Sequence, residues 1–169
     1  MKITEWFHSI NDINCLFTLN YKNMRKTIQL LLSQINESHL ILDCNHMWHS
    51  NAMNSNSTII MPNNLTELLL LSKNLQYNFQ NSKLFIIDML PVFFSDYQGT
   101  KFKNWLTNKK KISFYICNMN SLKDNRKIIL LFHSNTLNPE YPVFFDILRY
   151  YKIPCWNFKS PEEIVPLEY

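Results

Sequence analysis

The sequence predicts a single α/β domain with a mainly parallel sheet covered by helices on both faces. Along the 169 residues, short apolar runs typical of buried strands alternate with stretches whose apolar positions recur at helical spacing. No repeat, low-complexity block or Pro/Gly/Ser linker interrupts this alternation, so we expect one domain over residues 1–169. The hydrophobic fraction of 46% supplies enough material for its core.

The first half of the chain is expected to alternate strands and helices. Its apolar runs are short enough for buried strands, and its two longer stretches place leucine and isoleucine on one helical face. The expected elements are a strand over 15–19, a helix over 24–35, strands over 39–44 and 58–61, and a helix from 65 to about 79.

The second half continues the alternation around one polar stretch. A buried strand over 83–88 precedes a loop over 95–103, which contains the single glycine, Gly99. A helix over 103–122 follows, although its middle, 112–117, could instead be a strand. The remaining expected elements are a strand over 128–132, a helix over 143–151 and an edge strand over 154–158.

Composition excludes several classes of site. One glycine is too few for a glycine-rich phosphate loop. The four cysteines are far apart and embedded in apolar sequence, which predicts reduced core residues rather than metal ligands. The N-terminal residues lack a signal-peptide pattern and no apolar run is long enough to span a bilayer, so we expect a soluble intracellular protein. The cysteines are Cys15, Cys44, Cys117 and Cys155.

The stretch after the first expected strand has the length of a phosphate-binding loop. Residues 20–27 end in Lys26 and Thr27, as the GxxxxGK[ST] motif does, but Asn20 and Arg25 stand where its glycines belong. Glycine lets successive backbone N–H groups converge on a phosphate, and a side chain obstructs that approach. The sequence therefore predicts at most a degenerate loop.

Two later strand ends resemble motifs of the RecA-like recombinases. The strand that ends at Asp88 runs on through residues 89–99, which resemble the Walker B strand and following loop of the eukaryotic recombinases. Residues 128–135 are similar to the strand before the second DNA-binding loop of that family. Asn45 occupies the place of its catalytic glutamate. The order and spacing of these motifs agree with those of the family over residues 13–135. The chain therefore resembles a single-domain RecA-like recombinase paralogue with degenerate Walker motifs.

The resemblance implies a protein that does not hydrolyse ATP. Asn45 cannot act as a general base, so no catalytic residue, cofactor or metal site is expected. Lys26, Thr27 and Asp88 form a vestigial nucleotide site, where weak nucleotide contact without hydrolysis is a minority alternative. We expect Asp88 to be a strand-end residue that caps a neighbouring backbone group rather than to face a metal.

Short members of this family without working ATPase motifs resemble the recombinase paralogues of the Shu complex. These pair as heterodimers, bind DNA and assist assembly of the recombinase filament. The resemblance thus implies a paralogous RecA-like partner, single-stranded or forked DNA, the recombinase filament, a nuclear location and no membrane. The alternative is a RecA-like subunit of the Elongator type, which binds transfer RNA in a ring.

Basic residues after the strand that ends at Asp88 are the expected DNA contacts. Lysines there would neutralise phosphates without sequence preference, and the alternative is a solvated helix face. A second cluster, Lys123, Arg126 and Lys127, fits the solvated end of a helix. The expected DNA contacts are Lys101, Lys103, Lys109, Lys110 and Lys111.

Aromatic residues are concentrated near both ends of the chain. Because interfaces are enriched in such side chains, either end could dock a partner, and the alternative is that they belong to the core. The residues concerned are Trp6, Phe7, Tyr141, Phe144, Phe145, Tyr150, Tyr151, Trp156 and Phe158.

Overall fold

The computed structural model describes residues 1–48, 56–78, 82–89, 126–133 and 148–167. The expected loop over 95–103 and helix over 103–122 lie outside the described residues, as do Cys117 and all five lysines expected to contact DNA. Of the helix expected over 143–151, residues 148–151 are described: residues 148–150 are helical, and Tyr151 begins the turn that follows.

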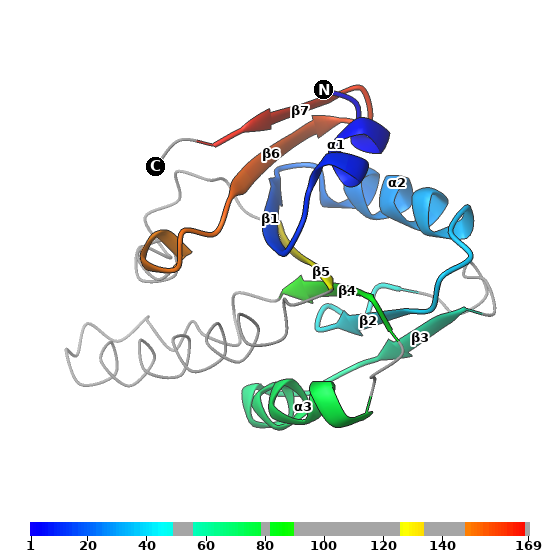
Figure 1. The fold of residues 1–169 in the computed structure, drawn as a ribbon, viewed down its shortest axis with the longest axis vertical. Helices are drawn as coiled ribbons and strands as arrows, with labels where there is room; N and C mark the ends of the chain where they lie inside the picture. Colours follow the sequence, from blue (N-terminus) through cyan, green and yellow to red (C-terminus); the bar gives the residue numbers. More distant parts are fainter. Residues whose placement is uncertain (49–55, 79–81, 90–125, 134–147, 168–169) are drawn as a thin grey trace.

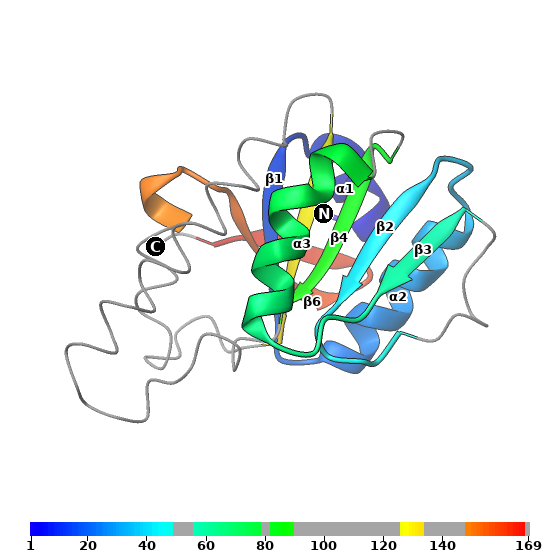
Figure 2. The same ribbon diagram turned by 90° about the horizontal axis from the view of Figure 1, so that it is seen from below.

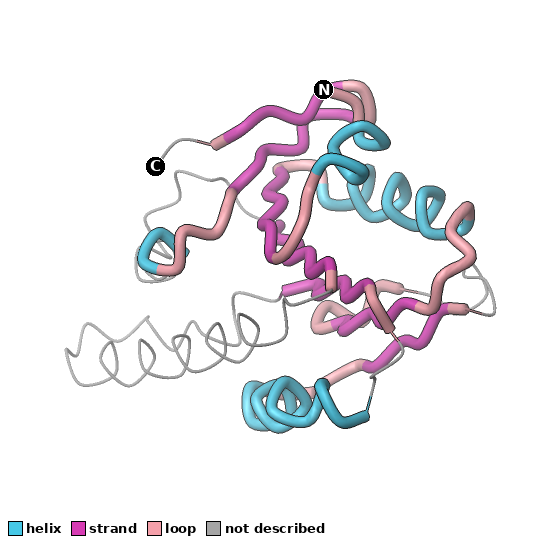
Figure 3. The backbone as a smooth tube through the Cα atoms, viewed as in Figure 1, coloured by secondary structure: helices cyan, strands magenta, loops and turns pink. Residues whose placement is uncertain are grey.

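Within the described residues, seven strands form one sheet, which confirms a mostly parallel α/β arrangement (Figures 1 and 3). Their order across the sheet is β3-β2-β4-β5-β1-β6-β7, and only β6 and β7 pair antiparallel. The strands are β1 (Ile13–Thr18), β2 (His39–Asp43), β3 (Ser57–Ile60), β4 (Leu84–Met89), β5 (Lys127–His133), β6 (Cys155–Ser160) and β7 (Glu163–Pro166).

Helices cover both faces of the sheet. α1 (Ile3–Ser9) and α2 (Tyr21–Ser33) pack on one face, and α3 (Leu65–Asn78) lies on the other (Figure 2). Successive side chains of each strand point to opposite faces of the sheet. On β4, Leu84 and Ile86 join the core beneath α1 and α2. Every residue of β1 and β2 is buried, which explains why these strands read as continuous apolar runs in the sequence.

Two elements appear that the sequence did not predict, and one prediction is wrong. α1 packs Trp6 into the core at 0% exposure, and β7 forms an edge of the sheet beyond β6. β6 is therefore an internal strand, paired with β1 on one side and β7 on the other, rather than the expected edge strand. Burial also removes Trp6, Phe7 and Phe158 as docking residues, because none of these side chains is more than 7% exposed.

The cysteines behave as expected wherever the structure describes them. Cys15, Cys44 and Cys155 are buried thiols. Cys15 lies opposite Cys155 in the β1–β6 register. Burial, together with the neighbouring Cys155, raises the pKa of the Cys15 thiol, so this thiol is poorly nucleophilic at neutral pH.

Arg126 and Lys127, the two members of the second basic cluster that the structure describes, do not lie at a solvated helix end. Lys123 lies outside the described residues. Lys127 begins β5, and its Nζ donates to the carbonyl oxygen of Phe7. The same Nζ lies 4.3 Å from the centre of the Phe7 aromatic ring. Arg126 donates from Nε to the Ser82 carbonyl oxygen at 3.3 Å, and its guanidinium lies over the ring of Phe85. These cations therefore hold α1 and the start of β4 against β5.

Candidate functional site

The carboxyl ends of the central strands bring polar side chains together around Asp88, which is 0% exposed near the end of β4. Trp48 Nε1 donates to its Oδ2 at 2.7 Å, and Asn45 Nδ2 donates to its Oδ1 at 2.7 Å. The hydroxyl of Tyr21, at the start of α2, also donates to Oδ2. Three side-chain donors from two connecting segments thus converge on one carboxylate.

Asp43 supports this cluster from the neighbouring strand. It lies opposite Asp88 in the β2–β4 register and is also 0% exposed. Its carboxylate accepts from the backbone N–H groups of Met47 at 3.1 Å and Trp48 at 2.9 Å. His46, with φ of 55°, supplies the left-handed turn that brings the chain back over the strand end. The turn fixes the indole of Trp48 where it reaches Asp88.

Burial dominates the electrostatics of the site. It raises the pKa of Asp88 to about 6, despite the opposing effect of the three donors, and the nearby Asp43 adds to the rise. Burial and the same carboxylate raise the pKa of Tyr21, so its hydroxyl stays protonated and remains a donor. At neutral pH, Asp88 is therefore an ionised carboxylate bound by protein donors.

Arg25 and His133 enclose Tyr21. The guanidinium of Arg25 lies 5.7 Å from the centre of the Tyr21 ring, and its Nη1 donates to the carbonyl oxygen of Met47. The imidazole of His133, the last residue of β5, stacks on the same ring with centroids 5.4 Å apart. Tyr21 is consequently held in the orientation that its bond to Asp88 requires.

Residues 20–27, which have the length of a phosphate-binding loop, form the N-cap and the first two turns of α2. Only Leu19 and Asn20 separate β1 from α2, and the Asn20 side chain caps the helix by accepting from the N–H of Asn23. Lys26 and Thr27 lie in the second turn of α2, with Lys26 exposed. A good N-cap thus starts the helix directly after the strand, at residue 21 rather than at the expected residue 24, and leaves no loop of phosphate-binding length.

Of the expected site residues, the structure joins Asp88 and Asn45 but places Lys26 outside their hydrogen-bonded cluster. Sequence reasoning missed Tyr21 and Trp48, although both follow strand ends. Asp88 takes the bonding role that we favoured, with side chains rather than backbone groups as its partners. Among the described residues, no three His, Cys, Asp or Glu side chains are grouped so that they could hold a metal ion.

A serine and a histidine also lie within hydrogen-bond distance at the opposite edge of the sheet. Ser57 Oγ is 2.6 Å from His39 Nε2, and His39 Nδ1 is 3.1 Å from the carbonyl oxygen of Glu37. The pair faces across the β2–β3 register, and His39 is 0% exposed. Its environment is that of a cross-strand contact holding the edge strand β3 in place.

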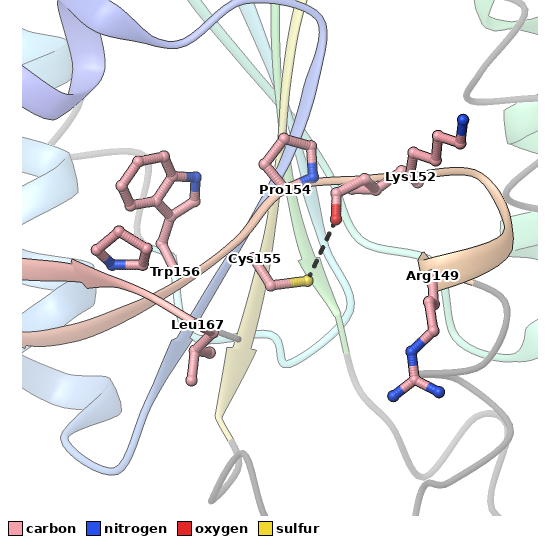
Figure 4. Close-up of a pocket in the computed structure, with 8 residues that line it drawn as sticks. Arg149, Lys152, Pro154, Cys155, Trp156 and Leu167 are labelled. Carbon is pink, nitrogen blue, oxygen red and sulfur yellow. Dashed lines mark hydrogen bonds between the residues drawn. The ribbon is translucent and has the colours of Figure 1, made fainter. Parts of the chain in front are cut away.

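An open cleft of about 490 Å³ lies near the amino-terminal end of β6, away from Asp88 (Figure 4). The Leu167 N–H donates to the Cys155 carbonyl oxygen at 2.8 Å, which holds the segment after β7 against the start of β6. The described residues that line it are Arg149, Lys152, Ile153, Pro154, Cys155, Trp156, Pro166 and Leu167.

No protein-family model matches the chain, and no curated protein matches it significantly. Within the described parts of the chain, no helix combines the length and the apolar character needed to cross a membrane. The site must therefore be interpreted from its own geometry.

Proposed function

We propose that the chain is a non-catalytic, RecA-like subunit that binds DNA and a paralogous partner and promotes assembly of a recombinase filament. Two observations support the proposal: the order of the RecA-like motifs in the sequence, and the mostly parallel sheet of the structure. It includes the nuclear setting and the heterodimer that the resemblance implies. The expected lysine contacts between residues 101 and 111 remain part of it.

The state of Asp88 is the observation that carries the non-catalytic assignment. A carboxylate that binds a nucleotide-associated metal must present oxygen atoms to an open site. Here both oxygens accept bonds from protein side chains, and the residue is 0% exposed. The two-residue connection between β1 and α2 supports the same assignment, because it lacks the length of a phosphate-binding loop.

The retained sheet supports a scaffold role. In parallel α/β domains, ligands bind beyond the carboxyl ends of the strands. Here Tyr21, Asn45 and Trp48 occupy positions next to those ends and bond to Asp88. The cluster ties β4 to the segments that follow β1 and β2, so it stabilises the domain that a partner would contact.

The binding part of the proposal is tested by titration. The purified chain, alone and with the partner that copurifies from the native source, would be titrated against labelled forked DNA and transfer RNA. We expect salt-sensitive binding to the DNA, with affinity falling linearly on a log–log plot. Absence of DNA binding by both samples refutes the proposal, and a clear preference for transfer RNA favours the Elongator type.

ATP turnover tests the non-catalytic part separately. We expect the chain and its Lys26→Ala variant to show the same background release of phosphate. Turnover by the chain that the substitution abolishes would refute the assignment, because Lys26 would then be acting on a phosphate.

A further inference from the structure

We propose that the cleft at the amino-terminal end of β6 binds single-stranded nucleic acid, with phosphates on Arg149 and Lys152 and an unstacked base on Tyr150. This inference rests on the proposed DNA-binding function and adds a surface to it. The carboxyl edge of the sheet is occupied by the cluster around Asp88. The cleft of about 490 Å³, by contrast, is open and within the size range of ligand sites, about 300–1,000 Å³.

The charge of the cleft selects an anionic ligand. Its described lining residues include two cations, Arg149 and Lys152, and no acidic residue. Both cations are exposed, and Figure 4 shows their side chains extending away from β6. A polyanion that follows the cleft would meet both charges, and phosphate contacts of this kind supply most of the affinity in nonspecific nucleic-acid binding.

Tyr150 provides an exposed aromatic platform next in sequence to the lining residue Arg149, although it is not itself one of the residues that line the cleft. It lies between the two cations in the sequence and is 80% exposed, the largest exposure among the large hydrophobic residues of the described chain. Its ring meets Tyr151 edge-on with centroids 5.1 Å apart. A base can stack on an exposed ring regardless of its identity, and basic side chains interleaved with such rings are the usual construction of single-strand sites.

The backbone holds this platform in a defined turn. Ile153 N–H donates to the Leu148 carbonyl oxygen and Lys152 N–H to that of Arg149, both at 3.0 Å. These two bonds form a Schellman motif with Lys152 at the position after the helix end, and its φ is 54°. Glycine is preferred at such a position, so Lys152 occupies a strained conformation while contributing a cation.

The wall of the cleft is also fixed. Trp156 Nε1 donates to Asn14 Oδ1 at 3.0 Å, and its ring packs edge-on against Trp6 with centroids 6.3 Å apart. Pro154 and Pro166 complete an apolar wall that has little freedom to rearrange. A preformed apolar wall beside two cations favours a flexible single strand, whose bases can turn outward, over a duplex whose bases are stacked inside.

The test measures binding of the full chain to a fluorescein-labelled oligothymidylate of about 20 nucleotides by anisotropy. Tyr150→Ala removes the stacking ring, and we expect affinity to fall about 5- to 150-fold. The double variant Arg149→Ala/Lys152→Gly removes both cations, and we expect the slope of log affinity against log salt to fall by about 1.4. Glycine suits the left-handed position, so the midpoint of denaturation of this variant should not fall below that of the unchanged chain.

The matched control is Lys22→Ala/Lys73→Ala, which removes two exposed cations, one from α2 and one from α3, and leaves the cleft intact. We expect it to bind like the unchanged chain. A second readout places 2-aminopurine in the oligonucleotide: its fluorescence should be quenched on binding by the unchanged chain and much less by Tyr150→Ala.

The outcomes separate this inference from the proposed function. If the unchanged chain binds the oligonucleotide but both cleft variants bind equally well, the inference is wrong while DNA binding stands. A duplex of the same length that competes as well as the single strand also refutes the inference. If neither the chain nor its partnered complex binds DNA at all, the proposed function itself fails.

Discussion

Replacing Asp88 by asparagine isolates the energetic cost of a buried charge. Burial raises the pKa of this carboxyl from its ordinary value of 3.8 to about 6 in the folded protein. An acid whose pKa is higher in the folded state binds its proton more tightly there than in the unfolded chain. The contribution of Asp88 to stability is therefore greatest at low pH, falls as the pH rises between these two values, and is constant above about 6.

The size of the effect follows from the same values. At ~1.36 kcal/mol per unit of pKa, the rise from 3.8 to about 6 corresponds to about 3 kcal/mol lost on ionisation. Asparagine has the same shape without the charge. Its oxygen can accept from Tyr21 and Trp48, and a rotation of the Asn45 amide would present an oxygen to the new amide nitrogen.

Urea unfolding followed by circular dichroism between about pH 4 and about pH 8 measures this cost. We expect the free energy of unfolding of Asp88→Asn, relative to the unchanged chain, to increase by about 2 kcal/mol over that range, because part of the full effect is already present at about pH 4. Glu162→Gln, which alters an exposed carboxylate, serves as the control and should show no comparable trend. A constant difference between Asp88→Asn and the unchanged chain would refute the argument that Asp88 ionises at a cost.

Three further substitutions test other parts of the fold by the same unfolding measurement. Trp48→Phe keeps an aromatic ring but removes the donor to Asp88, so we expect a loss of about 1–3 kcal/mol, and a loss of the same size in an Asp88→Ala background, which has no acceptor for the indole, would contradict the coupling of the two residues. Trp6→Ala empties a site at 0% exposure and should cost about 3–5 kcal/mol, whereas a cost below about 1 kcal/mol would mean that α1 does not stabilise the core. Lys152→Gly relieves a left-handed residue and should gain up to about 1 kcal/mol, and a loss of stability would show that Lys152 makes a compensating contact.

The strands of the sheet were largely predictable because they are buried on both faces. β4 and β5 appear in the sequence as continuous isoleucine and leucine runs, and the structure places each within one residue of the expected bounds at either end. β7 has only four residues and includes a proline, so no apolar run in the sequence predicted this strand. α1 carries the helical spacing of Ile3, Trp6, Phe7 and Ile10, but its seven residues are too few for a clear periodic signal.

The site was predictable in its location but not in its bonding. Strand order in parallel α/β domains indicates where Asp88 and Asn45 meet. The contacts of Trp48 depend on a left-handed His46, and those of Tyr21 depend on a helix that starts directly after β1. Both are consequences of local turn geometry and capping, which residue type alone does not determine. For this reason the early start of α2 and the side-chain partners of Asp88 were not predicted, whereas the strand ends beside them were.

The position of β1 in the sheet has a consequence for how the chain acquires its fold. β1 is the first strand in the sequence, yet its two neighbours are β5 and β6, which come from the last part of the chain. The sheet cannot close around β1 until both of those strands are available, so its contacts are long-range and loop closure must precede them. We expect slow folding after synthesis, and we expect a chain shortened before Cys155 to expose an unpaired edge of β1 that promotes association.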